Sequence, residues 1–149
     1  PYYLTGRLLR QFLTASRQPS LVVLLLQREV AERIVAKNGK ESLLSISVKV
    51  YGEAEYLHAV PAKHFSPPPK VDSAVLRIKN ISKKFFSKIN EERFFVLLHR
   101  AFQQKRKMLK NSLAVSPLVL SRCKIKTTAR AEELTLAQWS CLTKNLKTE

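Results

Sequence analysis

The sequence predicts an α/β domain followed by a small α-helical domain. In its first part a helical pattern, a short continuous apolar run and a second helical pattern follow one another, an order typical of doubly wound α/β domains. Two later segments alternate apolar and polar residues, as half-buried strands do. Past residue 79 the composition becomes polar and basic, and only helical periodicity follows. We therefore expect one domain over residues 1–80 and another over residues 81–149.

The first three elements are expected within residues 4–37. Residues 4–15 are predicted to form an amphipathic helix because five apolar side chains recur at helical spacing: Leu4, Leu8, Leu9, Phe12 and Leu13. Residues 21–26 read LVVLLL, which indicates a strand buried on both faces, as in a parallel sheet covered by helices. Residues 28–37 return to a helical period, which Asn38 and Gly39 end.

Three more segments favour strands. Residues 43–50 alternate serine or lysine with isoleucine or valine. Residues 53–60 alternate less regularly, and residues 72–79 place Ala74, Leu76 and Ile78 on one side. We expect the last two segments to form an antiparallel pair joined by the proline-rich loop between them.

The C-terminal part is predicted to be helical. Asn90 is expected to cap a helix over residues 91–102, and a second helix is expected over residues 104–114. Thr135 and Gln138, three residues apart, predict a capping box. The helix that follows carries an apolar stripe: Trp139, Leu142 and Leu146.

The charge indicates a polyanionic partner. The formal net charge is +16, and +11 of it falls in residues 79–149. The sequence pI is near 10.3. Such an excess points to nucleic acid first and to an anionic membrane second, and the alternative is a basic protein whose charge serves solubility. The longest apolar run, residues 21–26, is too short to span a bilayer, and no signal-peptide pattern is present, so we expect a cytoplasmic protein.

The cysteines and histidines give no metal-binding pattern. Cys123 and Cys141 lie far apart without the spacing of metal ligands, which favours reduced thiols in the cytoplasm. His58, His64 and His99 are isolated in sequence, so no metal is expected.

Four ordered motifs resemble the KsgA-type small-subunit ribosomal RNA adenine dimethyltransferases. They are PYYLTG at residue 1, LLLQREVAERI at residue 24, FSPPPKVDSAVLRI at residue 65 and FQQKRKMLKNSL at residue 102. The proline-rich motif differs from that of the related macrolide-resistance RNA methyltransferases. The resemblance implies the C-terminal part of a Rossmann-like class I methyltransferase domain, followed by the helical domain. The family's glycine-rich S-adenosylmethionine site has no counterpart in these residues, so we expect the 149-residue chain alone to be inactive.

The resemblance also implies roles for particular residues. A backbone carbonyl at or near Pro1 would accept a hydrogen bond from the amine of an extruded adenine, and Tyr2 and Phe65 would stack on its base. Pro67–Pro69 would hold Phe65 in place before RNA binds. The alternative is that Phe65 fills the core and the prolines protect a sheet edge.

Basic residues of the helical part are expected to contact RNA. They are Arg100, Lys105, Arg106, Lys107 and Lys110. The alternative is a solvated charged face. The partners implied by the resemblance are small-subunit rRNA and the immature small ribosomal subunit, with the full-length enzyme acting as a monomer. The competing class of function is a non-catalytic RNA-binding assembly or transcription factor on the same fold.

Overall fold

The computed structural model describes residues 4–104 and 106–146, which divide into two compact units. Unit 1 comprises the described part of Pro1–Gly39 together with Leu44–Lys83. Unit 2 comprises Lys40–Leu43 and the described part of Lys84–Glu149. The short segment Lys40–Leu43 belongs to unit 2 because the backbone N–H of Glu41 donates to the carbonyl of Glu132 at 2.9 Å.

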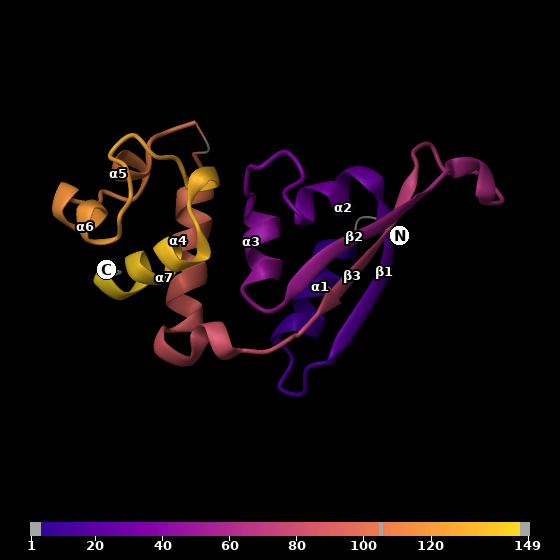
Figure 1. The fold of residues 1–149 in the computed structure, drawn as a ribbon, viewed down its shortest axis with the longest axis horizontal. Coiled ribbons are helices and arrows are strands. Elements are labelled where there is room, and N and C mark those ends of the chain that lie inside the picture. The colour runs from indigo at the N-terminus through magenta and orange to yellow at the C-terminus, as the bar shows by residue number, and fades with distance from the viewer. Residues whose placement is uncertain (1–3, 105, 147–149) are drawn as a thin grey trace. The chain divides into compact units, whose positions relative to one another are not determined.

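Unit 1 is a three-stranded sheet with helices (Figure 1). Along the chain it contains α1 (Thr5–Thr14), β1 (Leu21–Gln27), α2 (Arg28–Ile34), most of α3 (Leu43–Lys49), β2 (Glu53–Val60), the 3₁₀ turn η2 (Ala62–His64) and β3 (Ser73–Lys79). The strand order is β1-β3-β2, and both pairs are antiparallel. The predicted helix near the N-terminus, the strands near residues 53–60 and 72–79 and their antiparallel pairing are therefore confirmed.

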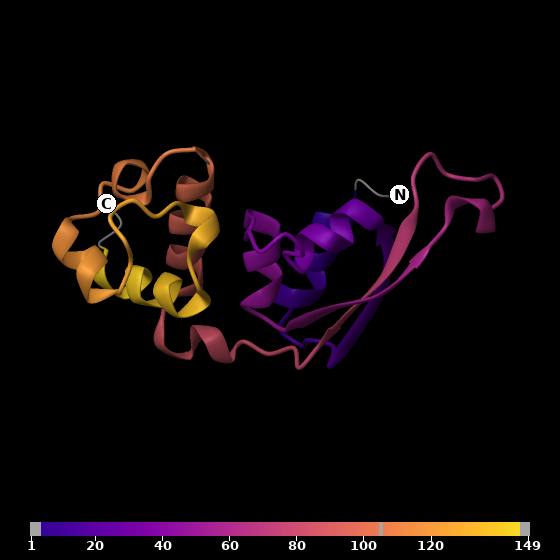
Figure 2. The ribbon, with the colours of Figure 1, turned by 45° about the horizontal axis from the view of Figure 1, so that its top comes forward.

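One face of the sheet forms the core of unit 1. Alternate residues point to the same face of a strand, and those of β3 on one face, Ala74, Leu76 and Ile78, are fully buried. The helices of unit 1 lie on one side of the sheet (Figure 2). They contribute Leu9, Leu13, Ala31, Ile34, Ile46 and Val48 to the buried set.

The expectation for residues 21–26 was partly wrong. A strand does form there, but it pairs antiparallel with β3, and only alternate side chains are buried. Val22 and Leu26 are buried, whereas Leu21, Val23 and Leu25 are 52%, 54% and 48% exposed. A continuous run of apolar residues therefore does not by itself show that both faces of a strand are buried by other residues of the same chain.

The prediction of a strand at residues 43–50 was wrong, since α3 is a helix. Ser45 is fully buried together with Ile46 and Val48, so the polar member of the alternation does not mark a solvent-facing side. The helix is followed by Gly52, where an added Cβ would lie 2.9 Å from the carbonyl oxygen of Lys79. Only glycine allows this close approach at the entry to β2.

The helix after β1 ends earlier than expected. The prediction extended it to residue 37, but α2 ends at Ile34. Ala36 adopts a left-handed backbone conformation with φ of 53°, so the helix stops before Asn38 and Gly39.

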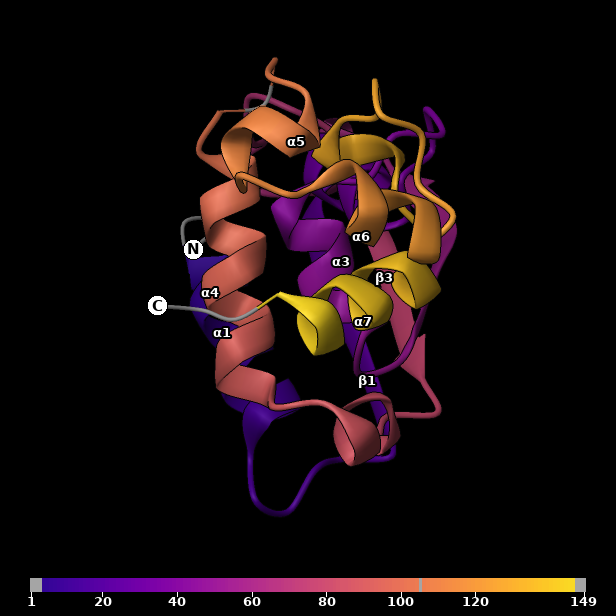
Figure 3. The ribbon, with the colours of Figure 1, turned by 90° about the vertical axis from the view of Figure 1, so that its left-hand side faces the viewer.

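Unit 2 contains four helices and two 3₁₀ turns (Figure 3). They are η3 (Lys84–Lys88), α4 (Glu91–Phe102), α5 (Leu109–Ser112), α6 (Pro117–Arg122), η4 (Ala131–Glu133) and α7 (Leu136–Asn145). The predicted cap of α4 is confirmed, because Asn90 Oδ1 accepts from the N–H of Arg93 at 2.8 Å. The capping box of α7 is also confirmed, since Thr135 Oγ1 and Gln138 Oε1 each accept from the other residue's N–H.

The core of unit 2 forms between α4 and α7. Phe94 and Leu98 of α4 and Trp139 and Leu142 of α7 are fully buried. The ring of Trp139 stacks on Phe102 with 6.2 Å between the centroids. The helix expected over residues 104–114 is shorter than predicted, because in the described part of this segment the helix α5 covers only Leu109–Ser112.

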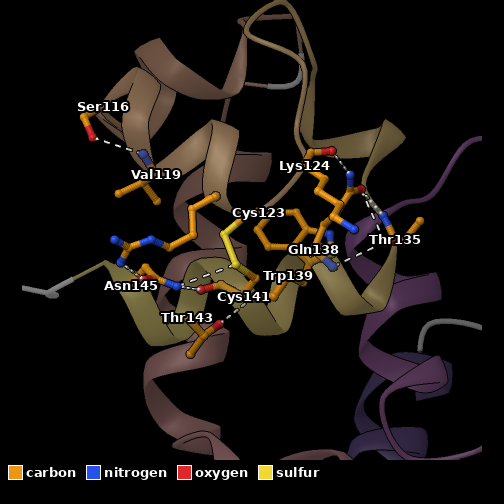
Figure 4. Close-up of a disulfide and its surroundings, with 11 residues drawn as sticks. Ser116, Val119, Cys123, Lys124, Thr135, Gln138, Trp139, Cys141, Thr143 and Asn145 are labelled. Carbon is orange, nitrogen blue, oxygen red and sulfur yellow. Dashed lines mark hydrogen bonds between the residues drawn. A yellow bond between two sulfur atoms is a disulfide. The ribbon is translucent and has the colours of Figure 1, made fainter.

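A disulfide joins Cys123, at the end of α6, to Cys141 of α7 (Figure 4). The expectation of separate reduced thiols was therefore wrong. The chain turns back between the two helices and brings the Cα atoms within 5.6 Å, although 18 residues separate them in sequence. A hydrogen bond stabilises this reversal of the chain between α6 and α7, because Gln138 Nε2 donates to the carbonyl of Lys124 at 2.7 Å.

Candidate nucleic-acid-binding site

The proline-rich segment forms a hairpin tip that extends past the end of the sheet, between β2 and β3 (Figures 1 and 2). Its two ends are tied together, because Asp72 Oδ1 accepts from the N–H of Ala62 at 2.9 Å. The carbonyl of Asp72 accepts from the N–H of Arg28 at 3.0 Å, which fastens the hairpin to the start of α2. The tip is thus anchored to unit 1 at its base.

Phe65 lies on this tip, directly after η2. Its backbone is extended and its N–H donates to the carbonyl of Ala62 at 3.1 Å. The side chain is half-buried and does not belong to the buried core. The alternative in which Phe65 fills the core is therefore not what the structure shows. Pro1 and Tyr2, the other residues expected to meet the base, lie outside the described residues.

An open groove of about 430 Å³ lies at the base of the hairpin. Three segments line the groove: the β1–α2 junction, the turn after β2, and the residues that lead into β3. Their lining residues are Gln27, Arg28, Glu29 and Glu32, then Ala62, and then Lys70, Val71 and Asp72. The groove lies at the carboxyl end of β1. These polar residues lie within the motifs that begin at residues 24 and 65, and that position was the only signal in the sequence for them.

Ion pairs determine the charge state of one groove residue. Glu32 Oε1 accepts from Lys37 Nζ at 3.0 Å and from Arg28 Nε at 3.1 Å. These hydrogen bonds lower the pKa of Glu32 below its ordinary value, and the bond to Glu32 raises the pKa of Arg28. Both groups are consequently charged at neutral pH.

The basic residues expected in the helical part lie near the turn between α4 and α5. Arg100 is exposed in the last turn of α4, and Arg106 and Lys107 are exposed in the turn itself. Lys110 is half-buried on α5. No acidic side chain in the described part of the chain pairs with these four residues. Lys105 lies outside the described residues.

The described residues do not fit S-adenosylmethionine. The chain has three glycines, and none of them lies in a turn between a strand and a following helix: Gly6 is in α1, Gly39 follows α2, and Gly52 precedes β2. A glycine-rich turn of that kind is what lets a dinucleotide-type cofactor approach the backbone. No step of the chemistry is therefore assigned to a cofactor held by these residues.

Two negative findings concern the described residues. Within residues 4–104 and 106–146, no cluster of three or more histidine, cysteine, aspartate or glutamate side chains is arranged to hold a metal ion. In the same residues, no helix has the length and apolar character needed to cross a membrane.

The fold is that of class I methyltransferases. The chain is similar to a solved dimethyladenosine transferase from Plasmodium falciparum, with a TM-score of 0.81 and 24% identity over 97% of this chain and 64% of the other. It is also similar to the 23S rRNA methyltransferase ErmE, with a TM-score of 0.70 and 22% identity over 97% of this chain and 61% of the other. At these identities the likeness concerns the fold alone.

Sequence comparison defines the family. The model described as ribosomal RNA adenine dimethylase matches residues 1–148, so the chain belongs to this family. Relatives named ribosomal RNA small subunit methyltransferase A include those of Dehalococcoides mccartyi, 39% identical over 95% of this chain, and Halothermothrix orenii, 37% identical over 98%. The chain spans 52% of the length of each of these two relatives.

Proposed function

We propose that the longer protein containing this chain transfers methyl groups from S-adenosylmethionine to N6 of adjacent adenines in a small-subunit rRNA hairpin. Each adenine would receive two methyl groups. The observation that carries this proposal is the family match over residues 1–148. The shared name of the relatives, ribosomal RNA small subunit methyltransferase A, supports the choice of RNA.

In this proposal, residues of this chain bind and orient the target base. The lone pair of the adenine amine is delocalised into the ring, so the amine is a weak nucleophile. A carbonyl at or near Pro1 would accept a hydrogen bond from the amine and orient the nitrogen, which is catalysis by positioning and oriented dipoles. Tyr2 and Phe65 would stack on the extruded base. The anchored hairpin supports the role of Phe65, since a ring that is already in place loses little entropy on binding.

Unit 2 would hold the RNA and the immature small subunit through its basic residues. Phosphate contacts position a protein on structured RNA without reading its sequence. This role is supported because no acidic side chain of the described residues pairs with Arg100, Arg106, Lys107 or Lys110. We further propose that the protein acts in the cytoplasm, where small subunits assemble, and that it is a monomer.

Replacing Lys105, Arg106 and Lys107 with alanine should flatten the salt dependence of RNA binding. Each lost phosphate contact removes about 0.7–0.9 from the slope of log K against log salt, so the loss is about 2 in total. The measurement is RNA affinity at several salt concentrations. The control is the triple alanine variant of Lys40, Arg77 and Lys79, which are already paired with glutamates that do not line the groove. An unchanged slope in the first variant would mean that those charges face only water.

The proposed activity is tested by joining this chain to the N-terminal part of the Dehalococcoides mccartyi relative. The joined protein should methylate small subunits that lack the modification, as the intact relative does in parallel. The 149-residue chain alone should transfer no methyl groups and should show no S-adenosylmethionine binding by calorimetry. Transfer by the relative but not by a folded joined protein would contradict the proposal, and cofactor binding by the chain alone would contradict the placement of the cofactor site.

A further inference from the structure

The groove at the base of the hairpin lies close along the chain to the proposed base-stacking ring. Its lining residues Ala62 and Lys70 come from the two sides of the hairpin tip, and Phe65 lies between them in sequence. A nucleotide whose base reached Phe65 would therefore bring its own backbone toward this part of unit 1. The groove is open to solvent and large enough for a phosphate group with part of a ribose.

The acidic side chains of the groove already have partners. Glu29 Oε1 accepts from Arg33 Nη2 at 2.7 Å, and Glu32 Oε1 accepts from Arg28 and Lys37. Asp72 Oδ1 accepts from the N–H of Ala62 at 2.9 Å. The negative charge that lines the groove is thus partly neutralised from within unit 1.

The cationic groups of the groove retain unused donors. Lys70 is exposed, and in the described part of the chain it makes no hydrogen bond or ion pair. Arg28 uses Nε toward Glu32, and its two terminal nitrogens bond no other described residue. An ammonium and a guanidinium with free N–H groups are the usual partners of a phosphate.

The two cations are held on a rigid frame. The backbone N–H of Arg28 donates to the carbonyl of Asp72, two residues after Lys70, so this contact joins the start of α2 to the hairpin base beside Lys70. The groove also has an apolar surface that a ribose can contact, formed by Ala62 and by Val71, whose side chain is 47% exposed. The groove therefore exists before RNA binds.

We propose that this groove binds a phosphodiester of the target RNA strand, next to the nucleotide whose base stacks on Phe65, with Lys70 and Arg28 as positioning residues. The inference rests on the proposed function, since it takes RNA as the ligand. Its role is to hold the strand on the side of the extruded base, so that the base enters the site in one orientation.

The test measures binding of the 149-residue chain to a short RNA hairpin in which single phosphates are replaced, one at a time, by neutral methylphosphonates. At one linkage the replacement should weaken binding about fivefold near 0.1 M salt, the effect of losing one phosphate contact on a single strand. Lys70→Ala should weaken binding of unmodified RNA by a similar factor. It should also remove the response at that linkage, and Lys70→Arg should restore it.

Lys63→Ala is the matched control, because Lys63 is exposed on the same hairpin but does not line the groove. It should leave the response to methylphosphonate intact. If the two alanine variants lose affinity equally and neither changes the response at any linkage, the hairpin supplies only diffuse charge and the groove site is overturned. That result would leave the proposed methyl transfer standing, whereas a folded chain that binds no RNA would contradict both proposals.

Discussion

If the proposed function holds, Phe65→Ala in the protein joined to the N-terminal part of the Dehalococcoides mccartyi relative should lower the rate of methyl transfer about 5- to 150-fold while leaving RNA affinity nearly unchanged. Stacking of one base on an aromatic ring contributes about 1–3 kcal/mol, which corresponds to that range of rates. Affinity should change little because most of the RNA contact is expected from the basic residues. The measurement is kcat/KM for undermethylated small subunits, made beside the dissociation constant of the same RNA.

Two further substitutions separate stacking from packing at this position. Phe65→Tyr keeps the aromatic face and should retain most of the activity. Phe65→Leu keeps apolar bulk without a π-face and should resemble alanine. If leucine restores transfer as well as tyrosine does, the side chain only packs in the hairpin, and the base-contact role of Phe65 is wrong.

Reduction of the Cys123–Cys141 disulfide should destabilise unit 2 by about 3 kcal/mol, because the bond closes a loop of moderate length and so restricts the unfolded chain. For a unit of this size the melting temperature should fall on the order of 10–20 °C. The chain has a single tryptophan, Trp139, which is fully buried in unit 2. Tryptophan fluorescence therefore follows the unfolding of unit 2 alone.

The matched control is the variant with both cysteines replaced by serine. It should melt at the temperature of the reduced protein and should not respond to a reducing agent. If the oxidised and reduced proteins melt together, the bond contributes nothing to the stability of unit 2. The difference in melting temperature between the oxidised and reduced proteins matters for any protein in the cytosol, since thiols are generally kept reduced there.

The elements that could be predicted from the sequence are those whose signals are local. Asn90 and Thr135 cap their helices as expected, because the capping contacts span only three residues. The strand β3 shows its alternation because one face alone meets the core. Residues 43–50 misled the prediction, since Ser45 is buried and a run of eight residues is short enough to satisfy either period.

Features that depend on distant parts of the chain were not predictable from the pattern. The disulfide requires the return of residues 124–135, which no spacing of two cysteines encodes. The groove joins Arg28 to Lys70 and Asp72 across more than forty positions of sequence, and each residue alone resembles an ordinary surface charge. Phe65 was singled out by resemblance to a family, and its role in base stacking stays a prediction.

The order β1-β3-β2 has a consequence for how unit 1 is made. Neither β1 nor β2 hydrogen-bonds the other, and both depend on β3, which is the last of the three strands to leave the ribosome. During synthesis β1 and β2 lack this shared partner until Lys79 has emerged from the exit tunnel, and pairings so remote in sequence form slowly. A ribosome that stalls before Ser73 would leave β1 and β2 without the strand that both of them pair with, so this is a stretch of translation at which a chaperone has much to protect.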